Sequence, residues 1–134
     1  MHGPPKRRRI RLSLDTYTRV GCTGLFTVCT NKRQPVLTAE PLCETLGRAL
    51  RQSGSDLPAA LLVWCVMPDH IHLLLQNLPG GDLVQWIARF KGRVAKEARA
   101  VGLRNLWQRG FHDRLLRKEE DLVHVARYVL ENPV

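Results

Sequence analysis

The sequence predicts an α+β fold, a ferredoxin-like sandwich in which a four-stranded antiparallel sheet carries helices packed on one face. Short apolar segments and segments of helical periodicity follow one another in the order strand, helix, strand, strand, helix, strand, helix. The two central strands are separated only by Pro68 and Asp69, a pair typical of a tight turn, which indicates a buried hairpin. A chain of 134 residues fits one such domain and leaves little room for a second.

The first half of the predicted domain holds one strand and one helix. Within residues 24–37, the run LFTVCTN is typical of a strand, and KRQPVL that follows is typical of a turn closed by Pro35. Residues 40–52 are predicted to form an amphipathic helix that ends near Ser53 and Gly54. Pro41 stands in its first turn, where the missing N–H costs little. The apolar positions recur four residues apart, at Leu42, Leu46 and Leu50.

The second half holds the hairpin, a further strand and two helices. Residues 60–67 and 71–76 are the apolar runs on either side of the turn, and residues 110–116 are predicted to form the last strand. The clearest helix is 82–101, whose apolar face consists of Leu83, Ile87, Phe90, Val94, Ala98 and Val101. A final helix over 119–131 opens with acidic residues, which suit a helix N-terminus. Its apolar stripe consists of Leu122, Val125, Ala126 and Val129.

The charge of the chain narrows the class of partner. Lysine and arginine total 21 against 12 acidic residues, which gives a formal net charge of +9. Such an excess favours a polyanionic partner, most commonly nucleic acid, although an acidic membrane surface or ribosomal RNA fits the charge equally well. Residues 1–9 are rich in proline, glycine and basic side chains. We therefore expect a flexible basic arm over residues 1–19 and a single domain over residues 20–134.

Apolar runs and cysteines both indicate a cytoplasmic protein. No apolar run is long enough to span a bilayer, and no apolar stretch follows the basic N-terminal residues as in a signal peptide. The cysteines form no Cys-x-x-Cys pair and stand at Cys22, Cys29, Cys43 and Cys65. In a reducing compartment this scatter favours small buried hydrophobic residues over disulfides or zinc ligands.

The most specific local motif is the pair of histidines that follows the hairpin turn. In a strand, His70 and His72 lie on one face and Ile71 on the other. Two imidazoles on one face can chelate a single metal ion, and the flanking apolar residues provide a rigid platform. The alternative is two ordinary histidines on the open face of a sheet.

A second group of polar residues lies in the final helix. His124, Tyr128 and Asn132 recur every four residues and form a stripe away from the apolar face. Tyr128 can therefore offer its hydroxyl to a phosphate, with Asn132 one turn later as a neutral oxygen donor for a metal. The alternative is a boundary tyrosine and an asparagine that ends the helix before Pro133.

Three separate blocks of this sequence resemble the REP-associated tyrosine transposases. The blocks are VMPDHIHLLL, LWQRGFHDRLLRKEEDL and ARYVLENPV, and the similarity extends from about Val20 to the end. This family is a branch of the single-tyrosine transposase superfamily, which shares a His-hydrophobic-His nuclease motif. One position departs from the commonest pattern, because His112 stands where a tyrosine or another aromatic residue is frequent. The fold of the family agrees with the order of elements predicted above.

The resemblance implies roles for individual residues. It assigns the metal-binding pair to His70 and His72, the nucleophile to Tyr128, and the third, polar metal ligand to Asn132. The block around the last strand implies structural or DNA-contacting roles for Trp107, Gln108, Arg109 and Asp113. The implied cofactor is a divalent ion, Mg²⁺ or Mn²⁺, since imidazole tolerates manganese and magnesium is the more abundant ion.

The implied activity is that of a transposase and endonuclease that cleaves and rejoins single-stranded DNA, in palindromic repeat hairpins, through a 5′-phosphotyrosine intermediate. Basic side chains would track the phosphate backbone without reading its sequence, and the expected set is Arg7, Arg8, Arg9, Arg89, Arg93, Lys96, Arg109, Arg114 and Arg117. Three alternatives remain: a catalytically inactive nucleic-acid-binding domain of the same fold, a hydrolase of small phosphorylated molecules, and an RNA-binding protein. The sequence leaves open whether the protein is a monomer or a homodimer.

Overall fold

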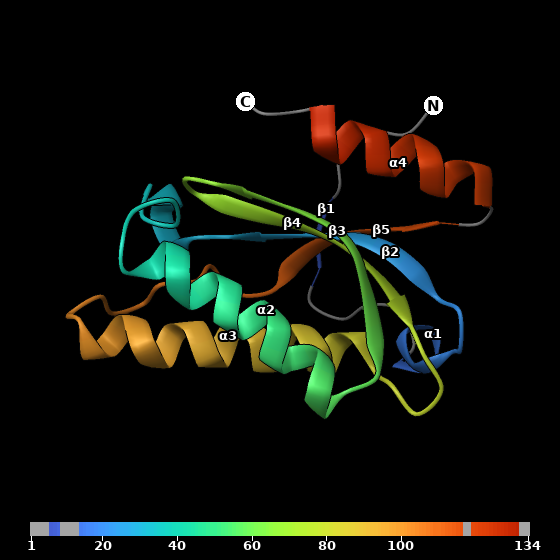
Figure 1. Ribbon diagram of the computed structural model, residues 1–134, viewed down its shortest axis with the longest axis horizontal. Helices are drawn as coiled ribbons and strands as arrows, with labels where there is room; N and C mark the ends of the chain where they lie inside the picture. Colours follow the sequence, from blue (N-terminus) through green and yellow to red (C-terminus); the bar gives the residue numbers. More distant parts are fainter. Residues whose placement is uncertain (1–5, 9–13, 117–118, 132–134) are drawn as a thin grey trace.

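The computed structural model describes residues 6–8, 14–116 and 119–131 of the chain. These residues form a central sheet with helices on both sides (Figure 1). The strands are β1 (Lys6–Arg8), β2 (Thr23–Cys29), β3 (Ala59–Met67), β4 (His70–Asn77) and β5 (Phe111–Leu116). The helices are α1 (Leu14–Thr18), the 3₁₀ turn η1 (Asn31–Arg33), α2 (Leu42–Asp56), α3 (Leu83–Ala100) and α4 (Glu119–Glu131).

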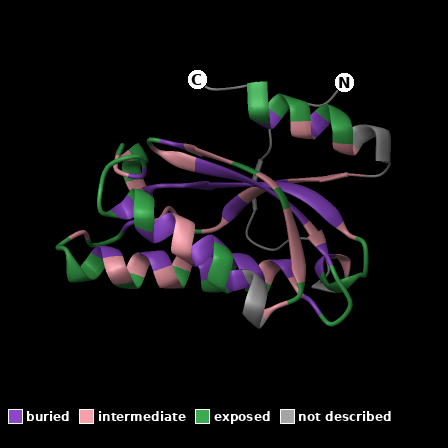
Figure 2. Ribbon diagram, viewed as in Figure 1, coloured by how far each residue is buried: buried purple, intermediate pink, exposed green. Residues whose placement is uncertain are grey.

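All neighbouring strands of the sheet pair in the antiparallel sense, in the order β1-β5-β2-β4-β3. The hairpin β3–β4 turns through Pro68 and Asp69, as predicted. In the centre of the sheet, β2 pairs with β4 on one side and with β5 on the other. Both β2 and β4 are buried along nearly their whole length (Figure 2). The strands β2 and β4 therefore form the buried middle of the sheet.

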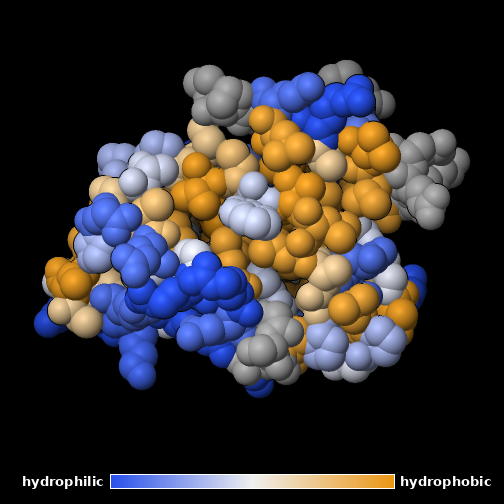
Figure 3. Space-filling model, viewed as in Figure 1, coloured by the Kyte–Doolittle hydropathy of each residue, from blue (hydrophilic) through white to orange (hydrophobic). Residues whose placement is uncertain are grey.

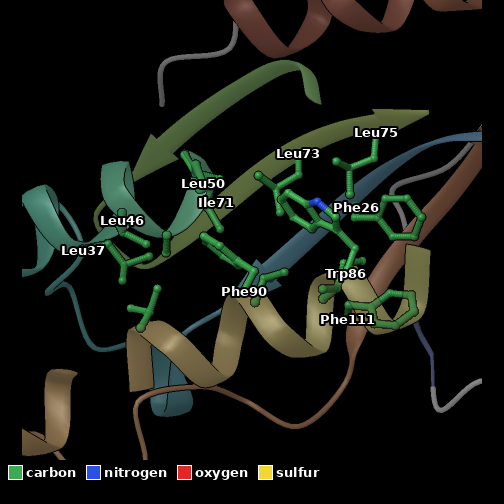
Figure 4. Close-up of a cluster of buried hydrophobic side chains, with 14 of the residues drawn as sticks. Phe26, Leu37, Leu46, Leu50, Ile71, Leu73, Leu75, Trp86, Phe90 and Phe111 are labelled. Carbon is green, nitrogen blue, oxygen red and sulfur yellow. The ribbon is translucent and has the colours of Figure 1, made fainter. Parts of the chain in front are cut away.

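The larger hydrophobic core fills the space between the sheet and the helices α2 and α3. The close-up of this core shows Phe26 of β2 and the aliphatic residues of β4 against Trp86 and Phe90 of α3 (Figure 4). The indole of Trp86 stacks on Phe90 with ring centroids 5.8 Å apart. The α3 helix begins where predicted, because the Asp82 side chain accepts a hydrogen bond from the backbone N–H of Gln85 at 3.2 Å.

The predicted α+β class and its four antiparallel strands are confirmed, and the structure corrects one detail of the prediction. Helix α4 packs on the face of the sheet opposite α2 and α3, so the helices do not all lie on one face (Figure 1). The physical reason is that the second face also carries apolar residues. Leu25 of β2 and Leu74 of β4 are fully buried there against Val125 and Val129 of α4.

The N-terminal region contributes elements that were not predicted. The short strand β1 adds a fifth strand to the sheet beside β5. In α1, Tyr17 is fully buried in the larger core, and its hydroxyl donates a hydrogen bond to Oδ2 of Asp113 at 3.0 Å. The sequence predicted that the folded domain begins at residue 20. Because Tyr17 belongs to the larger core, the packed part of the chain includes residues before that position.

Two further predictions need correction. Helix α2 runs to Asp56, beyond the predicted end near Ser53, because Ser53 is buried against α3 and its hydroxyl accepts from Nη1 of Arg93 at 3.1 Å. The cysteines are free thiols, as expected, but only Cys29 is fully buried, and Cys43 is exposed on α2. No described helix is long and apolar enough to cross a membrane.

Candidate active site

The predicted histidine pair occupies the first and third positions of β4. Ile71 between them is fully buried in the larger core, so the two imidazoles project from the opposite face, on the side of α4. Their ring centroids lie 4.8 Å apart. Strand β2 supports them from the side, since Cys29 is opposite His70 and Thr27 is opposite His72. The expected side-by-side arrangement of the pair is therefore present.

Each histidine has a partner at its Nδ1 atom. Nδ1 of His70 lies 2.8 Å from Oδ1 of Asp69, and Nδ1 of His72 lies 2.9 Å from Oγ1 of Thr27. A carboxylate only accepts hydrogen bonds, so Asp69 favours the tautomer of His70 that carries its proton on Nδ1. The Nε2 lone pair of His70 is then available to a metal, an arrangement common around metal-binding histidines.

Burial keeps His72 in the form that a metal requires. The pKa of His72 is lowered to about 4, first because burial disfavours the charged ring and second because His70 lies beside it. A neutral imidazole is the metal-binding form, so no proton has to leave His72 at neutral pH before an ion binds. The donor set therefore fits a divalent ion.

Arg33 connects the turn η1 to this pair. Its Nε donates to Oδ2 of Asp69 at 2.9 Å, so the carboxylate is held between Arg33 and His70. The hydrogen bond from Arg33, and then that from His70, hold the pKa of Asp69 below its usual range. Lys32 and Arg33 adopt positive φ values of 54° and 56°. Side-chain-bearing residues rarely adopt this conformation, and such strain often accompanies functional sites.

These residues enclose a small polar pocket of about 180 Å³ over the sheet, lined by Thr27, Cys29, Arg33, His70, His72 and His112. Sequence reasoning had not assigned a role to Thr27 or Arg33, and it had noted His112 only as a departure from a family pattern. The register of the sheet brings these three residues together from distant parts of the chain. Alternation along β5 was the one available signal for His112, because its neighbour Phe111 belongs to the core.

Helix α4 places Tyr128 next to the histidine pair. The ring centroids of His72 and Tyr128 are 6.4 Å apart, and the rings are inclined by 66°. Val125 and Val129 anchor the helix on the sheet, whereas Tyr128 remains 46% exposed and therefore accessible to a substrate. The structure thus brings together three of the predicted site residues from β4 and α4.

The other predicted site residues have different locations. Asn132, Arg9 and Arg117 lie outside the described residues. Strand β1 contains the predicted Arg7 and Arg8, and Arg7 is opposite His112 in the register of the sheet. Arg109 is exposed in the loop before β5, and Arg114 on β5 is partly buried. Among the described residues, no group of three or more His, Cys, Asp or Glu side chains is placed to hold a metal.

The basic residues predicted on α3 to contact DNA do not line this pocket. Arg89, Arg93 and Lys96 belong to a helix on the other side of the sheet from the histidine pair (Figure 1). Arg93 also donates to Ser53 of α2, so one of its functions is to join the two helices. A nucleic acid bound at the histidine pair would have to extend around the domain to contact these residues, because they lie on the other side of the sheet.

A larger cleft of about 500 Å³ lies between β3 and α4, lined mainly by aliphatic residues such as Leu62 and Leu130. Apolar side chains gather on this face of the molecule, below α4 (Figure 3). The cleft lacks the convergent polar groups of the smaller pocket. The histidine pair and the polar residues around it therefore line the smaller pocket and not this cleft.

Comparison with known proteins identifies the family of this chain. A family profile described as "Transposase IS200 like" matches residues 19–132, which include the histidine pair and Tyr128. The chain belongs to the IS200-like transposase family. The family acts on DNA, and the resemblance inferred from three sequence blocks is confirmed.

Individual relatives agree with this assignment. The chain is 32% identical over 115 residues to the REP-associated tyrosine transposase of Escherichia coli, and the match covers 85% of this chain and 67% of that protein. A solved REP-associated tyrosine transposase bound to a REP hairpin superposes with a TM-score of 0.74 at 28% identity, covering 87% of this chain and 69% of the other. A transposase candidate from Deinococcus radiodurans, with a TM-score of 0.60 at 21% identity over 87% of this chain and 95% of that one, shares the fold.

Proposed function

We propose that this protein cleaves and rejoins single-stranded DNA beside a hairpin, with Tyr128 as the nucleophile and a divalent metal, Mg²⁺ or Mn²⁺, held by His70 and His72. The observation that carries the proposal is the contact between the rings of His72 and Tyr128. These residues come from adjacent layers, strand β4 and the helix α4 that packs on it, and His72 also lines the polar pocket.

The chemistry of these side chains suits phosphodiester cleavage. A phenol is largely protonated at neutral pH and is then a weak nucleophile, so the phosphate that it attacks must be activated. When bound, a divalent ion supplies positive charge that polarises the scissile phosphate. His70 and His72 are suited to hold the ion through Nε2, because the Nδ1 atoms of both rings have other partners. Asn132 is the remaining proposed ligand, carried over from the family resemblance.

In the proposed reaction, the hydroxyl oxygen of Tyr128 forms a bond to phosphorus as its proton leaves. The bond from phosphorus to the 3′ oxygen breaks, and that oxygen takes up a proton. The products are a 5′-phosphotyrosine and a free 3′ hydroxyl. Because the covalent link preserves the energy of the phosphodiester bond, the reverse reaction rejoins strands without ATP.

DNA as the substrate is supported by the charge and by the relatives. The net charge of +9 favours a polyanion. Arg109 is exposed before β5, Arg114 lies on β5 itself, and β1 with its basic residues is the neighbouring strand. One relative of known structure was solved with a REP hairpin bound. We assign the basic residues around β5 and β1, together with the N-terminal arm, to contacts with phosphates.

A covalent trapping experiment tests this function. The protein is incubated with an end-labelled DNA hairpin that carries a single-stranded flank, in the presence of Mn²⁺ or Mg²⁺, and covalent protein–DNA adduct is measured on denaturing gels. Wild-type protein should form adduct, and the adduct should disappear with a chelator or in the variants Tyr128→Phe and His72→Ala. The variant Tyr17→Phe serves as a tyrosine control, because Tyr17 is buried on the other side of the sheet.

The result also distinguishes the competing function. Retention of the hairpin by wild-type protein without any adduct would support a DNA-binding domain that lacks catalysis. Adduct that persists in Tyr128→Phe would eliminate Tyr128 as the nucleophile. Adduct that is insensitive to chelation would eliminate the metal.

A further inference from the structure

The register of the sheet places a third histidine beside the proposed metal-binding pair. Thr27 of β2 lies opposite His72 on β4 and also opposite His112 on β5. All three side chains line the same pocket. His72 and His112 are therefore on two walls of the pocket, with Thr27 on the floor between them.

The backbone at His112 is held firmly in this position. Phe111, the preceding residue, is buried in the larger core. Nζ of Lys91 donates to the carbonyl oxygens of Gln108 and Gly110 at 3.0 and 2.9 Å. The segment that leads into β5 is thus bound to α3, and the orientation of His112 follows from the alternation of the strand.

His112 is not placed to share a metal ion with the pair. In the described part of the chain, no group of three His, Cys, Asp or Glu side chains is placed to hold an ion, although His70, His72 and His112 line one pocket.

A phosphate group suits the space between the two walls. The pocket has a volume of about 180 Å³, and its described lining carries the guanidinium of Arg33 and three imidazoles but no carboxylate. Such a lining favours an anion. A phosphate with one oxygen directed to the pair therefore has another oxygen on the side of β5, where His112 lies.

We propose that His112 donates a hydrogen bond to the scissile phosphate, at the non-bridging oxygen that faces away from His70 and His72. This inference rests on the proposed function and adds a substrate-contacting residue to it. The N–H of an imidazole is a donor in either protonation state. A donor at this position stabilises the charge that the non-bridging oxygens carry in the transition state.

Stereospecific sulfur substitution tests the contact. Hairpin DNA is prepared with one or the other non-bridging oxygen of the scissile phosphate replaced by sulfur, and the single-turnover rate of adduct formation is measured at saturating DNA. The proteins are wild type, His112→Phe, His112→Gln and His124→Phe. His124 is exposed on α4 and is absent from the lining of the pocket, so His124→Phe controls for loss of an imidazole elsewhere. Thermal unfolding and hairpin affinity show that each variant is folded.

We expect His112→Phe to lower the rate with unmodified DNA about ten-fold to a hundred-fold, His112→Gln to recover much of it, and His124→Phe to match wild type. Sulfur at the oxygen that faces His112 should slow the wild type but add no further loss to His112→Phe. Sulfur at the other oxygen should slow both proteins equally, with relief by Mn²⁺.

Two results would overturn the inference while leaving the proposed function intact. One is wild-type cleavage by His112→Phe, and the other is an equal loss from both sulfur substitutions in wild type and in His112→Phe. Absence of adduct from the wild type itself would overturn the proposed function and this inference together.

Discussion

The carboxylate of Asp69 joins Arg33 to His70, with His70 Nδ1 at 2.8 Å from one carboxylate oxygen and Arg33 Nε at 2.9 Å from the other. An exposed ion pair of this kind contributes little to overall stability. Its effect is instead on orientation, because the carboxylate fixes both the tautomer and the rotation of the His70 ring.

Asp69→Ala should weaken binding of Mn²⁺ by about ten-fold to a hundred-fold, the usual cost of removing a partner of a metal-binding histidine. Calorimetric titration of the metal measures the change. Asp82→Ala is the matched control, since Asp82 caps α3 far from the pair. That control should lower the free energy of unfolding by about 1 kcal/mol and leave metal affinity unchanged. Equal metal affinity in wild type and Asp69→Ala would contradict the orienting role.

Thr27→Val should impair both stability and metal binding, because it removes the hydroxyl that pairs with Nδ1 of His72 and keeps the shape of the side chain. His72 is 7% exposed, so its nitrogen would be left without a partner at a cost of about 1 to 3 kcal/mol. Chemical denaturation and metal titration measure the two effects. Thr27→Ser retains the hydroxyl and should keep the metal affinity of wild type; a loss equal to that of Thr27→Val would argue against the hydrogen bond.

Val125→Ala should lower adduct formation without altering metal affinity, because Val125 anchors the helix that carries Tyr128 while the metal pair belongs to the sheet. Val125 is 1% exposed, and its truncation should cost about 2 kcal/mol. Val123 of the same helix is 61% exposed, so Val123→Ala provides a control with little effect on either quantity. Adduct formation at the wild-type rate in Val125→Ala would show that packing of α4 does not limit Tyr128.

Tyr17→Phe should lower the free energy of unfolding by about 1 to 3 kcal/mol, since it removes a buried donor to the carboxylate of Asp113. The melting temperature, followed by circular dichroism, should fall by several degrees. Tyr128→Phe is the comparison, because the Tyr128 side chain is 46% exposed and its hydroxyl should add little to stability. Identical melting temperatures for Tyr17→Phe and wild type would remove α1 from the stabilising core.

Local patterns in the sequence were sufficient to predict the longer helices and strands. Periodicity defined α3 and α4, and the continuous apolar runs defined β3 and β4, because burial of one face imposes a regular spacing. The strand β1 has three residues and exists through its pairing with β5, so it has no periodicity of its own. The apolar stripe of α4 indicated that the helix packs against something, but it did not show which face of the sheet.

The site was predicted only where its residues are close in sequence or match a family block. His70 and His72 are two positions apart, and strand geometry alone puts them on one face. Thr27 and His112 join them through register across three strands, which depends on pairing between distant segments. Arg89, Arg93 and Lys96 of α3 illustrate the opposite case. They were expected to contact DNA, but nothing in the local sequence indicated that their helix lies across the sheet from the pair.

The hydrogen bonds of Lys91 have a consequence for how strongly salt should oppose DNA binding. Lys91 directs its ammonium group to backbone carbonyls, Arg33 pairs with Asp69, and Arg48 pairs with Glu44 and Glu97. Cations held in this way displace few of the counterions condensed on a nucleic acid, because their charge already interacts with groups of the protein. The total of 21 lysine and arginine side chains is therefore an overestimate of the phosphates that this surface can neutralise.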